Sequence, residues 1–345
     1  MDLDEIRDAL SEAEYSFVVP GIALYFVAVY FRSLRWRYLL SPIGSFSVGS
    51  LYPVVVIGYM ANNLLPARLG ELVRSYYLAR RERVSASSTL ATVAVERVYD
   101  GVTLLALAAA SGLVLLLLGE FSGGSDISTF TVIVLATLTV LGFLATLALL
   151  TLLAMSPKFV EMFDRCLDIT PSRIRPKARE LYHTFVQGLS ILSSPRRHLG
   201  LFVLSLPVWL LEAGVYLVIA YSFGINALFG SFWVLMLVVL LLTATSNLAT
   251  SVPTSIGGIG PFEVVAQQTL LVLGVGGSLA VTYAGFVHLV ALWLPVNLVG
   301  LGLLWRQNLS LKNLVATPTA STAELAPGFD GGPSRTQTRP KEGQL

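Results

Sequence analysis

Charged residues are scarce in this sequence. Asp, Glu, Lys and Arg make up 13% of its 345 residues, about half the share of an average soluble domain. So few charges cannot cover the surface of a soluble protein, whereas apolar residues reach 54% and the mean hydropathy is +0.73. Cys166 is the only cysteine, which excludes a disulfide framework. A net charge of +2 without a separate basic domain disfavours a nucleic-acid binder. The composition predicts an integral membrane protein.

Lys and Arg are absent from residues 199–305 and unevenly distributed elsewhere. Eight lie in residues 32–83, eight in 155–198 and five from 306 onward. Loops rich in Lys and Arg stay on the cytoplasmic side of a membrane. With no cleavable signal in the chain, we expect a multi-pass protein of the cytoplasmic (inner) membrane. Its N-terminus is expected outside and its C-terminus inside.

Apolar runs long enough to cross a bilayer, about 20 residues, define the expected fold. We predict an all-α, polytopic integral membrane helical bundle with five full spans: Ser16–Phe31, Gly101–Leu118, Thr129–Met155, Leu199–Phe223 and Ser278–Trp305. Arg32, Arg35 and Trp36 follow the first run, and we expect them to anchor it at the membrane interface.

The same pattern divides the chain into five segments. Residues 1–15 are predicted to be a polar interfacial segment, and 16–154 a first transmembrane half plus an extra span. Residues 155–198 form a cytoplasmic amphipathic segment, and 199–305 the second transmembrane half. Residues 306–345, rich in Pro, Gly, Ser and Thr, are expected to be a disordered cytoplasmic tail.

Two further apolar segments, 49–83 and 231–275, are interrupted. Their candidate structural or gating residues are Pro66 and Gly70 in the first, and Pro253, Gly257, Gly258 and Gly260 in the second. The flanking charges place both ends of each segment on one side, which favours re-entrant hairpins over two short crossings.

The order helix, Pro, Gly, Glu recurs after about 190 residues, and the extra span inverts the second half. Matching interruptions in inverted halves are typical of a transporter site, because freed backbone groups need protein or water partners. Two kinked packing helices are the alternative.

Ionisable side chains at membrane depth cost about 2.5–3.5 kcal/mol each, and the first half holds several. With one asparagine they form the first candidate set: Asn63, Arg68, Glu71, Arg74, Glu96, Arg97 and Asp100. One interpretation is an internal ion-pair network that locks the first hairpin to the next helix. The other is a polar cavity in which Arg68, Arg74 and Arg97 contact a phosphate, since the guanidinium fork suits its oxygens. The two interpretations are compatible.

The second half has carboxylates but no neighbouring base. Glu212 and Glu263 are expected either to be protonated through desolvation or to pair with arginines of the first half. Glu263 and His288 complete the candidate substrate-binding residues. A histidine can exchange a proton near neutral pH, although one in an apolar helix is more often hydrogen-bonded packing. We find no catalytic, metal or cofactor set, because the chain has three His, one Cys and no carboxylate–histidine cluster.

Four motifs together carry a family resemblance: RSLRWRYLL, NNLLPARLGELVRSYYL, TVAVERVYDG and SVPTSIGGIGPFE. Over most of residues 15–305 the chain resembles the lysylphosphatidylglycerol synthase transmembrane, or flippase-like, family. The resemblance implies movement of aminoacylated phosphatidylglycerol or polyisoprenyl-linked glycolipids across the cytoplasmic membrane. Two departures stand out. Fused members carry a long C-terminal soluble aminoacyl-transferase domain, whereas this chain has only a short tail, so lysyl transfer is not inferred. Members usually begin with one more hydrophobic helix, whereas this chain opens with the polar MDLDEIRDALSEAEY, which is expected to be an interfacial helix.

We therefore expect a non-enzymatic membrane lipid transporter whose partners are anionic, aminoacylated or polyisoprenyl-linked lipids. A membrane-embedded lipid-modifying enzyme, with Glu96 or Asp100 as base, is a second reading, although it lacks a nucleophile or metal set. A third is an adaptor that holds a glycosyltransferase or lipid synthase at the membrane.

Overall fold

A computed structural model describes residues 3–121, 174–251 and 255–307, with some positions between 141 and 165. Helices are the only regular elements in this part of the chain. Five helical stretches are long and apolar enough to cross a membrane: Tyr15–Leu39, Ala86–Leu118, Pro195–Ser222, Phe232–Ala249 and Gly277–Arg306. The protein is a polytopic α-helical membrane protein, as the composition predicts.

The described helices fall into two groups along the chain. The first group is α1 (Leu3–Glu12), η1 (Tyr15–Phe17), α2 (Val18–Leu39), α3 (Val48–Leu64), η2 (Pro66–Arg68), α4 (Gly70–Glu82) and α5 (Ala86–Leu118). The second begins with α8 (Arg175–Gly188), η4 (Leu189–Ser193), α9 (Pro195–Ser222), η5 (Ile225–Leu228) and α10 (Phe232–Ala249). It continues with η6 (Ile256–Gly258), α11 (Pro261–Val272), α12 (Gly277–Gly285), the π-helical η7 (Phe286–Trp293) and α13 (Leu294–Arg306).

Serine caps fix where three of these helices begin. The side chains of Ser47, Ser85 and Ser231 each accept a hydrogen bond from the backbone N–H three residues later. This bond satisfies one of the four N–H groups that the first turn of a helix leaves without a partner. α3, α5 and α10 therefore start at defined positions.

Four of the five expected spans coincide with long helices, namely α2, α5, α9 and the continuous α12–η7–α13. α2 and α5 are longer than expected, because α2 continues to Leu39 and α5 already begins at Ala86. The expected span Thr129–Met155 lies largely outside the described residues, although positions 144–152 include helical ones. Pro253 and the tail from 308 also lie outside them.

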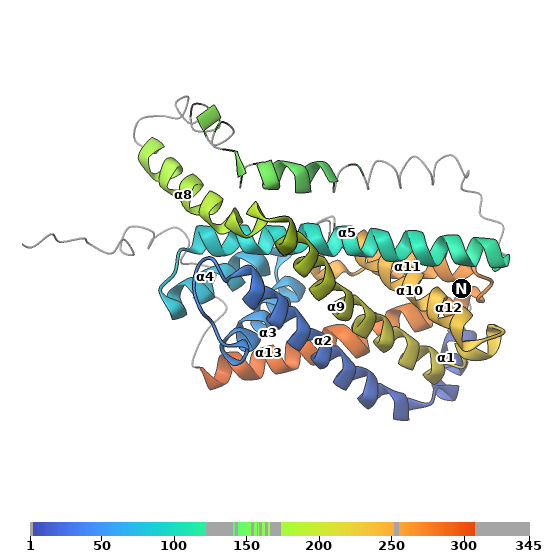
Figure 1. The fold of residues 1–345 in the computed structure, drawn as a ribbon. Coiled ribbons are helices and arrows are strands. Elements are labelled where there is room, and N and C mark those ends of the chain that lie inside the picture. The colour runs from blue at the N-terminus through green and yellow to red at the C-terminus, as the bar shows by residue number, and fades with distance from the viewer. Residues whose placement is uncertain are drawn as a thin grey trace, which may run out of the picture.

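The two groups of helices are arranged as inverted halves. α2 and α9 run antiparallel along each other, since the N–H of Glu14 donates to the C=O of Ser222 over 2.8 Å, and Tyr38 lies against Gly200 at the opposite end. α3 packs on α4 and α13, and in the same way α10 packs on α11 and α5. Figure 1 shows α5 and α12–α13 running in opposite directions. The interrupted helix of each half, α3 or α10, thus packs on the last long helix of the other half, α13 or α5. Two inverted copies of one helical unit produce this reciprocal packing.

The interrupted segments keep the same helix–break–helix form in both halves. α3 and α4 are separated by η2, and α10 and α11 are separated by η6. The two breaks contact each other, and η6 also contacts α3. The re-entrant topology itself stays a prediction, but the breaks meet where the two halves face each other.

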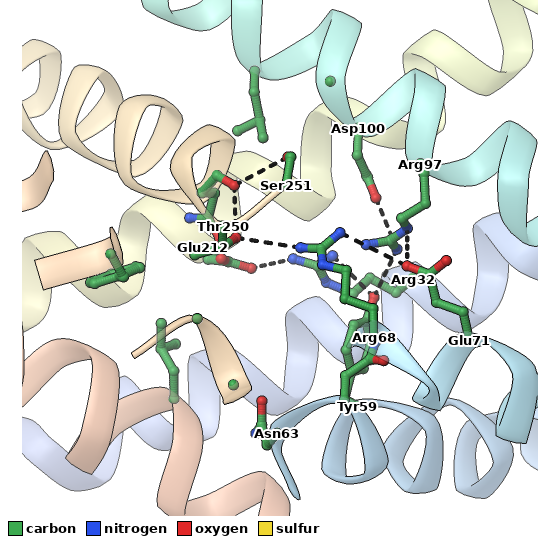
Figure 2. A pocket seen from close by; sticks show the side chains of 18 of the residues that line it. Arg32, Tyr59, Asn63, Arg68, Glu71, Arg97, Asp100, Glu212, Thr250 and Ser251 are labelled. Carbon is green, nitrogen blue, oxygen red and sulfur yellow. Dashed lines mark hydrogen bonds and ion pairs between the residues drawn. The ribbon is translucent and has the colours of Figure 1, made fainter. Parts of the chain in front are cut away.

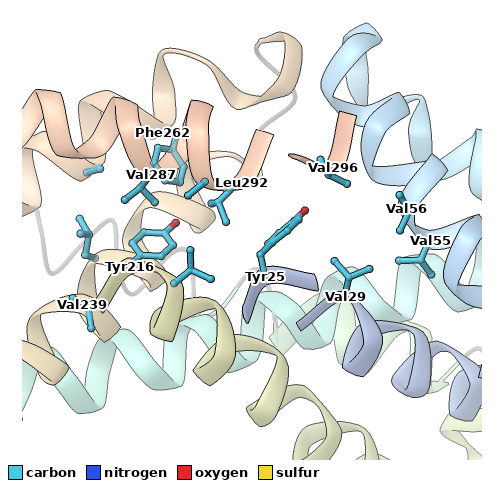
Figure 3. Packing of buried hydrophobic residues seen from close by; sticks show 14 of the residues in the cluster. Tyr25, Val29, Val55, Val56, Tyr216, Val239, Phe262, Val287, Leu292 and Val296 are labelled. Atoms are coloured by element: carbon cyan, nitrogen blue, oxygen red, sulfur yellow. The ribbon is translucent and has the colours of Figure 1, made fainter. Parts of the chain in front are cut away.

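A continuous apolar core surrounds the meeting point of the breaks. Side chains of α2, α3, α9, α11 and η7 join one buried cluster. Figure 3 shows Tyr216 beside Phe262 and Val287, and Tyr25 between this group and Val29. One contiguous core is what a single packed domain has, so the two halves are held as one body.

Gly70 allows the closest backbone approach at the first break. A Cβ atom added there would lie 2.2 Å from the C=O oxygen of Gly58 and 2.4 Å from the backbone nitrogen of Asn62. Both neighbours are backbone atoms of α3, which cannot rotate away. Only glycine therefore lets α4 start against the end of α3.

We expect Gly70→Ala to destabilise the protein by about 1–3 kcal/mol, the usual cost of overpacking. Thermal unfolding of the purified protein in detergent measures this as a lower Tm. Gly302→Ala is the matched control, because a Cβ at this helical position meets no atom within 4 Å. Equal midpoints for Gly70→Ala and wild type would show that the breaks are not packed this closely.

The predicted orientation can be tested with single cysteines, since Cys166 is the only one to remove. We expect Ser41→Cys and Arg81→Cys, both exposed beside the interrupted segment, to be protected from an impermeant maleimide in intact cells. Gly230→Cys, at the opposite end of the bundle, should be labelled without permeabilisation. Labelling of Ser41 and Arg81 from different sides would contradict a segment that enters and leaves on one face.

Candidate functional site

A cavity of about 820 Å³ lies between the two halves and beside both breaks, a volume typical of ligand-binding clefts. Its wall takes residues from α2, α3, η2, α4, α5 and α9, and from α10, η6, α11 and η7. Many of these side chains are polar: Arg32, Tyr59, Asn62, Asn63, Arg68, Glu71, Arg97, Asp100, Trp209, Glu212, Asn247, Thr250, Ser251, Ser255 and His288. Figure 2 shows the arginines converging from the first half.

Two carboxylates one turn apart on α5 organise the arginines. Glu96 is fully buried and accepts two bonds from Arg74, of 3.0 and 2.8 Å, and one of 2.9 Å from Arg97. Asp100 pairs with Arg35 at 2.7 Å and with Arg97 at 2.9 Å. Arg35 also lies 3.3 Å from Glu96. Buried charges persist only when they are paired and hydrogen-bonded, and the i,i+4 spacing of these acids provides that pairing.

Arg32 and Arg35 are not at the membrane interface, so that expectation was wrong. Their exposed fractions are 5% and 0%, because α2 continues beyond them to Leu39 and packs along α9. Arg32 forms an ion pair with Glu212 of α9 and donates to the hydroxyl of Tyr59 over 3.1 Å. Glu212 is thus paired with a base of the first half, one of the two states expected for it.

Arg74 lies behind the cavity wall, away from where a phosphate contact was expected. Its guanidinium lies over the ring of Trp36 at 3.7 Å, and both terminal nitrogens bond to Glu96. Neither Arg74 nor Glu96 lines the cavity. These two residues therefore support the cavity from within the protein, as the network interpretation predicts.

Arg68 and Arg97 present their side chains to the cavity, with exposed fractions of 29% and 25%. Arg68 is held loosely: it lies 3.8 Å from Glu71 and 3.5 Å from the hydroxyl of Thr250. Its backbone is left-handed, with φ of 55°. Such strain costs on the order of 1–3 kcal/mol in a non-glycine residue and concentrates at functional sites.

The described polar cluster has more positive than negative groups. It contains five arginines and four carboxylates: Arg32, Arg35, Arg68, Arg74 and Arg97, with Glu71, Glu96, Asp100 and Glu212. One positive charge is thus in excess, on the side of the cavity where Arg68 has the weakest contacts. An anion is the ligand that this arrangement accommodates at the lowest electrostatic cost.

The second break forms the opposite wall. His288 of η7 is 2.6 Å from one carboxylate oxygen of Glu263, and the other oxygen accepts the N–H of Gly260 over 2.7 Å. The imidazole is stacked on Phe262, with ring centres 4.2 Å apart. His288, Gly257 and Gly258 line the cavity, while Glu263 and Gly260 lie behind them.

The other candidates lie around the breaks. Asn63 lines the cavity and donates to Asn297 of α13 over 3.3 Å. Pro66 and Gly70 form the first break without lining the cavity. Several uncharged wall residues escaped the sequence argument, which followed charge alone: Tyr59, Trp209, Asn247, Thr250 and Ser251. The sequence does carry a signal that Arg32 is interior: the apolar run before it continues as a helical pattern through RSLRWRYLL, so the span does not end at Arg32.

We expect Glu96→Gln to destabilise the protein by about 3–5 kcal/mol, since it leaves buried arginines without their counter-charge. The change is measured as loss of folded protein and of Tm in detergent. Glu82→Gln is the control, because its pair with Arg81 at 3.6 Å is partly exposed and is worth about 0–1 kcal/mol. A tolerated Glu96→Gln would mean that the cluster does not hold the fold together.

Three known proteins are similar to this chain over stretches of different lengths. Glycosyltransferase AglD of Haloferax volcanii is 28% identical over 289 residues, which cover 76% of this chain and 44% of that protein. A UPF0104 membrane protein of Methanothermobacter thermautotrophicus is 36% identical over 100 residues, or 28% of this chain and 29% of its own. A UPF0104 membrane protein of Pyrococcus horikoshii is 27% identical over 309 residues, or 85% and 88%.

The chain thus spans less than half of the first two relatives and most of the third. No solved structure matches it. The family described as lysylphosphatidylglycerol synthase TM region matches residues 1–299, a range that contains the cavity, both breaks and every paired charge described above. The chain belongs to this family of membrane proteins, which its four sequence motifs indicate as well.

Proposed function

We propose that this protein is a membrane lipid transporter that moves a phosphate-bearing head group between the leaflets of the cytoplasmic membrane. The proposal rests on one observation: Arg68 and Arg97 face a cavity between two inverted halves, beside a break in each. Polar side chains and interrupted backbone at membrane depth are costly. A polar group that passes through the cavity accounts for their position.

The charges favour an anionic head group over a cationic one. The three carboxylates that line the cavity, Glu71, Asp100 and Glu212, each already pair with an arginine. A cation would have to compete with these guanidinium groups, whereas a phosphate can join Arg68 and Arg97 through their free donors. The binding of an aminoacylated, cationic head group is therefore the less favoured case.

The neutral part of the wall suits hydroxyl groups. Asn62, Asn63, Asn247, Thr250 and Ser251 lie around the cavity next to the arginines. Amide and hydroxyl side chains offer both donors and acceptors, which is what a glycerol or sugar attached to phosphate requires. The acyl or isoprenyl chains are excluded from such a wall by their hydrophobicity and stay in the bilayer.

The two breaks supply the moving parts. η2 and η6 contact each other, and each precedes a short helix, α4 or α11. Reciprocal opening of the two segments would give the head group access from one leaflet and then from the other. Arg68 sits in the first break and is displaced with it.

The relatives suggest where such transport belongs. One matched protein is named as a glycosyltransferase, and the matched region is 44% of its length. The family takes its name from a lipid synthase. We propose that the shared membrane region moves a lipid that is the substrate or product of a synthase or glycosyltransferase. That enzyme is either a separate partner protein or a domain fused to the membrane region.

Liposomes that contain the purified protein and leaflet-labelled phosphatidylglycerol test the proposal. We expect accelerated flip over protein-free vesicles, and a rate lower by about tenfold or more in Arg68→Ala. The reason is that a lost hydrogen bond to a charged group is worth about 1.5–3 kcal/mol. Arg81→Ala, a change at an exposed arginine of α4, the helix that follows the break with Arg68, should keep the wild-type rate.

Other outcomes distinguish the rival functions. Chemical change of the labelled head group in the same vesicles would support a lipid-modifying enzyme. Neither flip nor chemistry, together with a stable co-purifying synthase, would support an adaptor. Equal rates for Arg68→Ala and wild type would remove the cavity from the transport path.

A further inference from the structure

A second ionisable pair stands opposite the arginines and has no part in the function proposed above. It consists of His288, which lines the cavity, and Glu263 behind it, 2.6 Å apart. The imidazole is buried from the outside, with an exposed fraction of 7%, yet it forms part of the cavity wall. It belongs to η7, a π-helical turn within the last span, and such turns occur frequently at functional sites.

The hydrogen bonds of this pair determine where a proton can be gained. A carboxylate oxygen of Glu263 faces Nδ1 of His288, an arrangement that favours the hydrogen on Nδ1 and leaves Nε2 as the basic nitrogen. Imidazole is the side chain that ordinarily exchanges a proton near neutral pH. Uptake of one proton at Nε2 takes the pair from one negative charge to none.

The same pair is attached to the second break. The second oxygen of Glu263 accepts the N–H of Gly260, directly before α11. A change of charge on the pair thus acts on the hydrogen bond that fixes the start of α11. The three described glycines of this break, Gly257, Gly258 and Gly260, all have positive φ, which leaves the backbone free to reorient.

Thr250 and Gly258 lie between this pair and the arginine wall. The Thr250 hydroxyl is 3.5 Å from Arg68. Gly258 has both Thr250 and His288 as neighbours, since a Cβ added there would lie 2.8 Å from Thr250 Cγ2 and 3.9 Å from His288 Cε1. An anion held by Arg68 therefore lies within range of the charge on the pair.

The second half supplies no Lys or Arg to balance the pair. α10 and η6 carry no ionisable side chain, and residues 199–305 contain no Lys or Arg. The nearby cations belong to the first half: Arg68 of η2, which lies 3.5 Å from Thr250, and Arg32 of α2, which is held by Glu212 of α9. The ionisable side chains on elements packed against η7 and α11 also include three tyrosines, Tyr25, Tyr216 and Tyr283. Proton uptake by His288 is thus the means within the second half of cancelling the charge of Glu263.

We propose that His288 and Glu263 form a proton-binding site that couples proton uptake to binding of the anionic head group. The inference rests on the proposed transport function. At high pH the negative pair opposes the anion, and at low pH the neutral pair admits it. Binding of the anion and binding of the proton therefore favour each other, so that transport rises as pH falls.

The test measures flip of labelled phosphatidylglycerol in liposomes at equal pH on both sides, between about pH 6 and pH 8. The phosphodiester of this probe keeps its charge throughout this range, so the lipid itself contributes no pH dependence. We expect the wild-type rate to fall severalfold as the pH rises. His183→Asn, an exposed histidine on α8, should keep that slope.

Two variants should move in opposite directions. His288→Asn leaves Glu263 charged, so the rate should stay at the low, high-pH level across the range. Glu263→Gln removes the charge but keeps an oxygen for the N–H of Gly260, so the rate at high pH should approach the wild-type rate at low pH. A merely structural role predicts a loss of rate in both, without opposite effects.

The outcomes separate this inference from the function on which it rests. Flip that is independent of pH in the wild type overturns the coupling and leaves transport intact. Absence of flip at every pH overturns the transport proposal, and the coupling with it. The wild-type profile requires no substitution, so it decides the question even where a variant fails to fold.

Discussion

The pairing of buried charge in a low-dielectric interior is the constraint on which the rest of this structure depends. Ionised groups removed from water are tolerated only with partners of opposite charge and good hydrogen-bond geometry. Glu96 meets this condition with three arginines drawn from α2, α4 and α5. The same contacts therefore join the first span, the interrupted segment and the long helix α5, and they hold open the polar space beside them.

The network and the cavity are two parts of one arrangement. Arg35, Arg74 and Glu96 face inward, and both arginines pair with the Glu96 carboxylate. Arg68 and Arg97 stand at the edge of this group, where the excess positive charge reaches the cavity. A buried group of paired charges thus positions the arginines at the cavity wall, which is the usual relation between supporting and ligand-binding residues.

The inverted arrangement explains why one wall differs from the other. Corresponding helices of the two halves make corresponding contacts, yet the first half contributes arginines and the second contributes Glu263 and His288. Symmetry of the backbone gives two matching breaks. Asymmetry of the side chains gives one wall with arginines and an opposite wall with His288, which Glu263 supports.

The sequence by itself determined the class of fold, the position of most long helices, both interruptions and the membership of Arg68, Glu71, Arg97 and Asp100 in a polar site. These follow from local properties, namely run length, breaker residues and the cost of charge in a membrane. Only the tertiary structure decided that Arg32 and Arg35 are interior, that Arg74 stacks on Trp36, and that Glu263 meets His288. Each of these depends on which helices lie side by side, because the partners are 25 to 180 residues apart in the chain, and spacing within a helix carries no information about such distant neighbours.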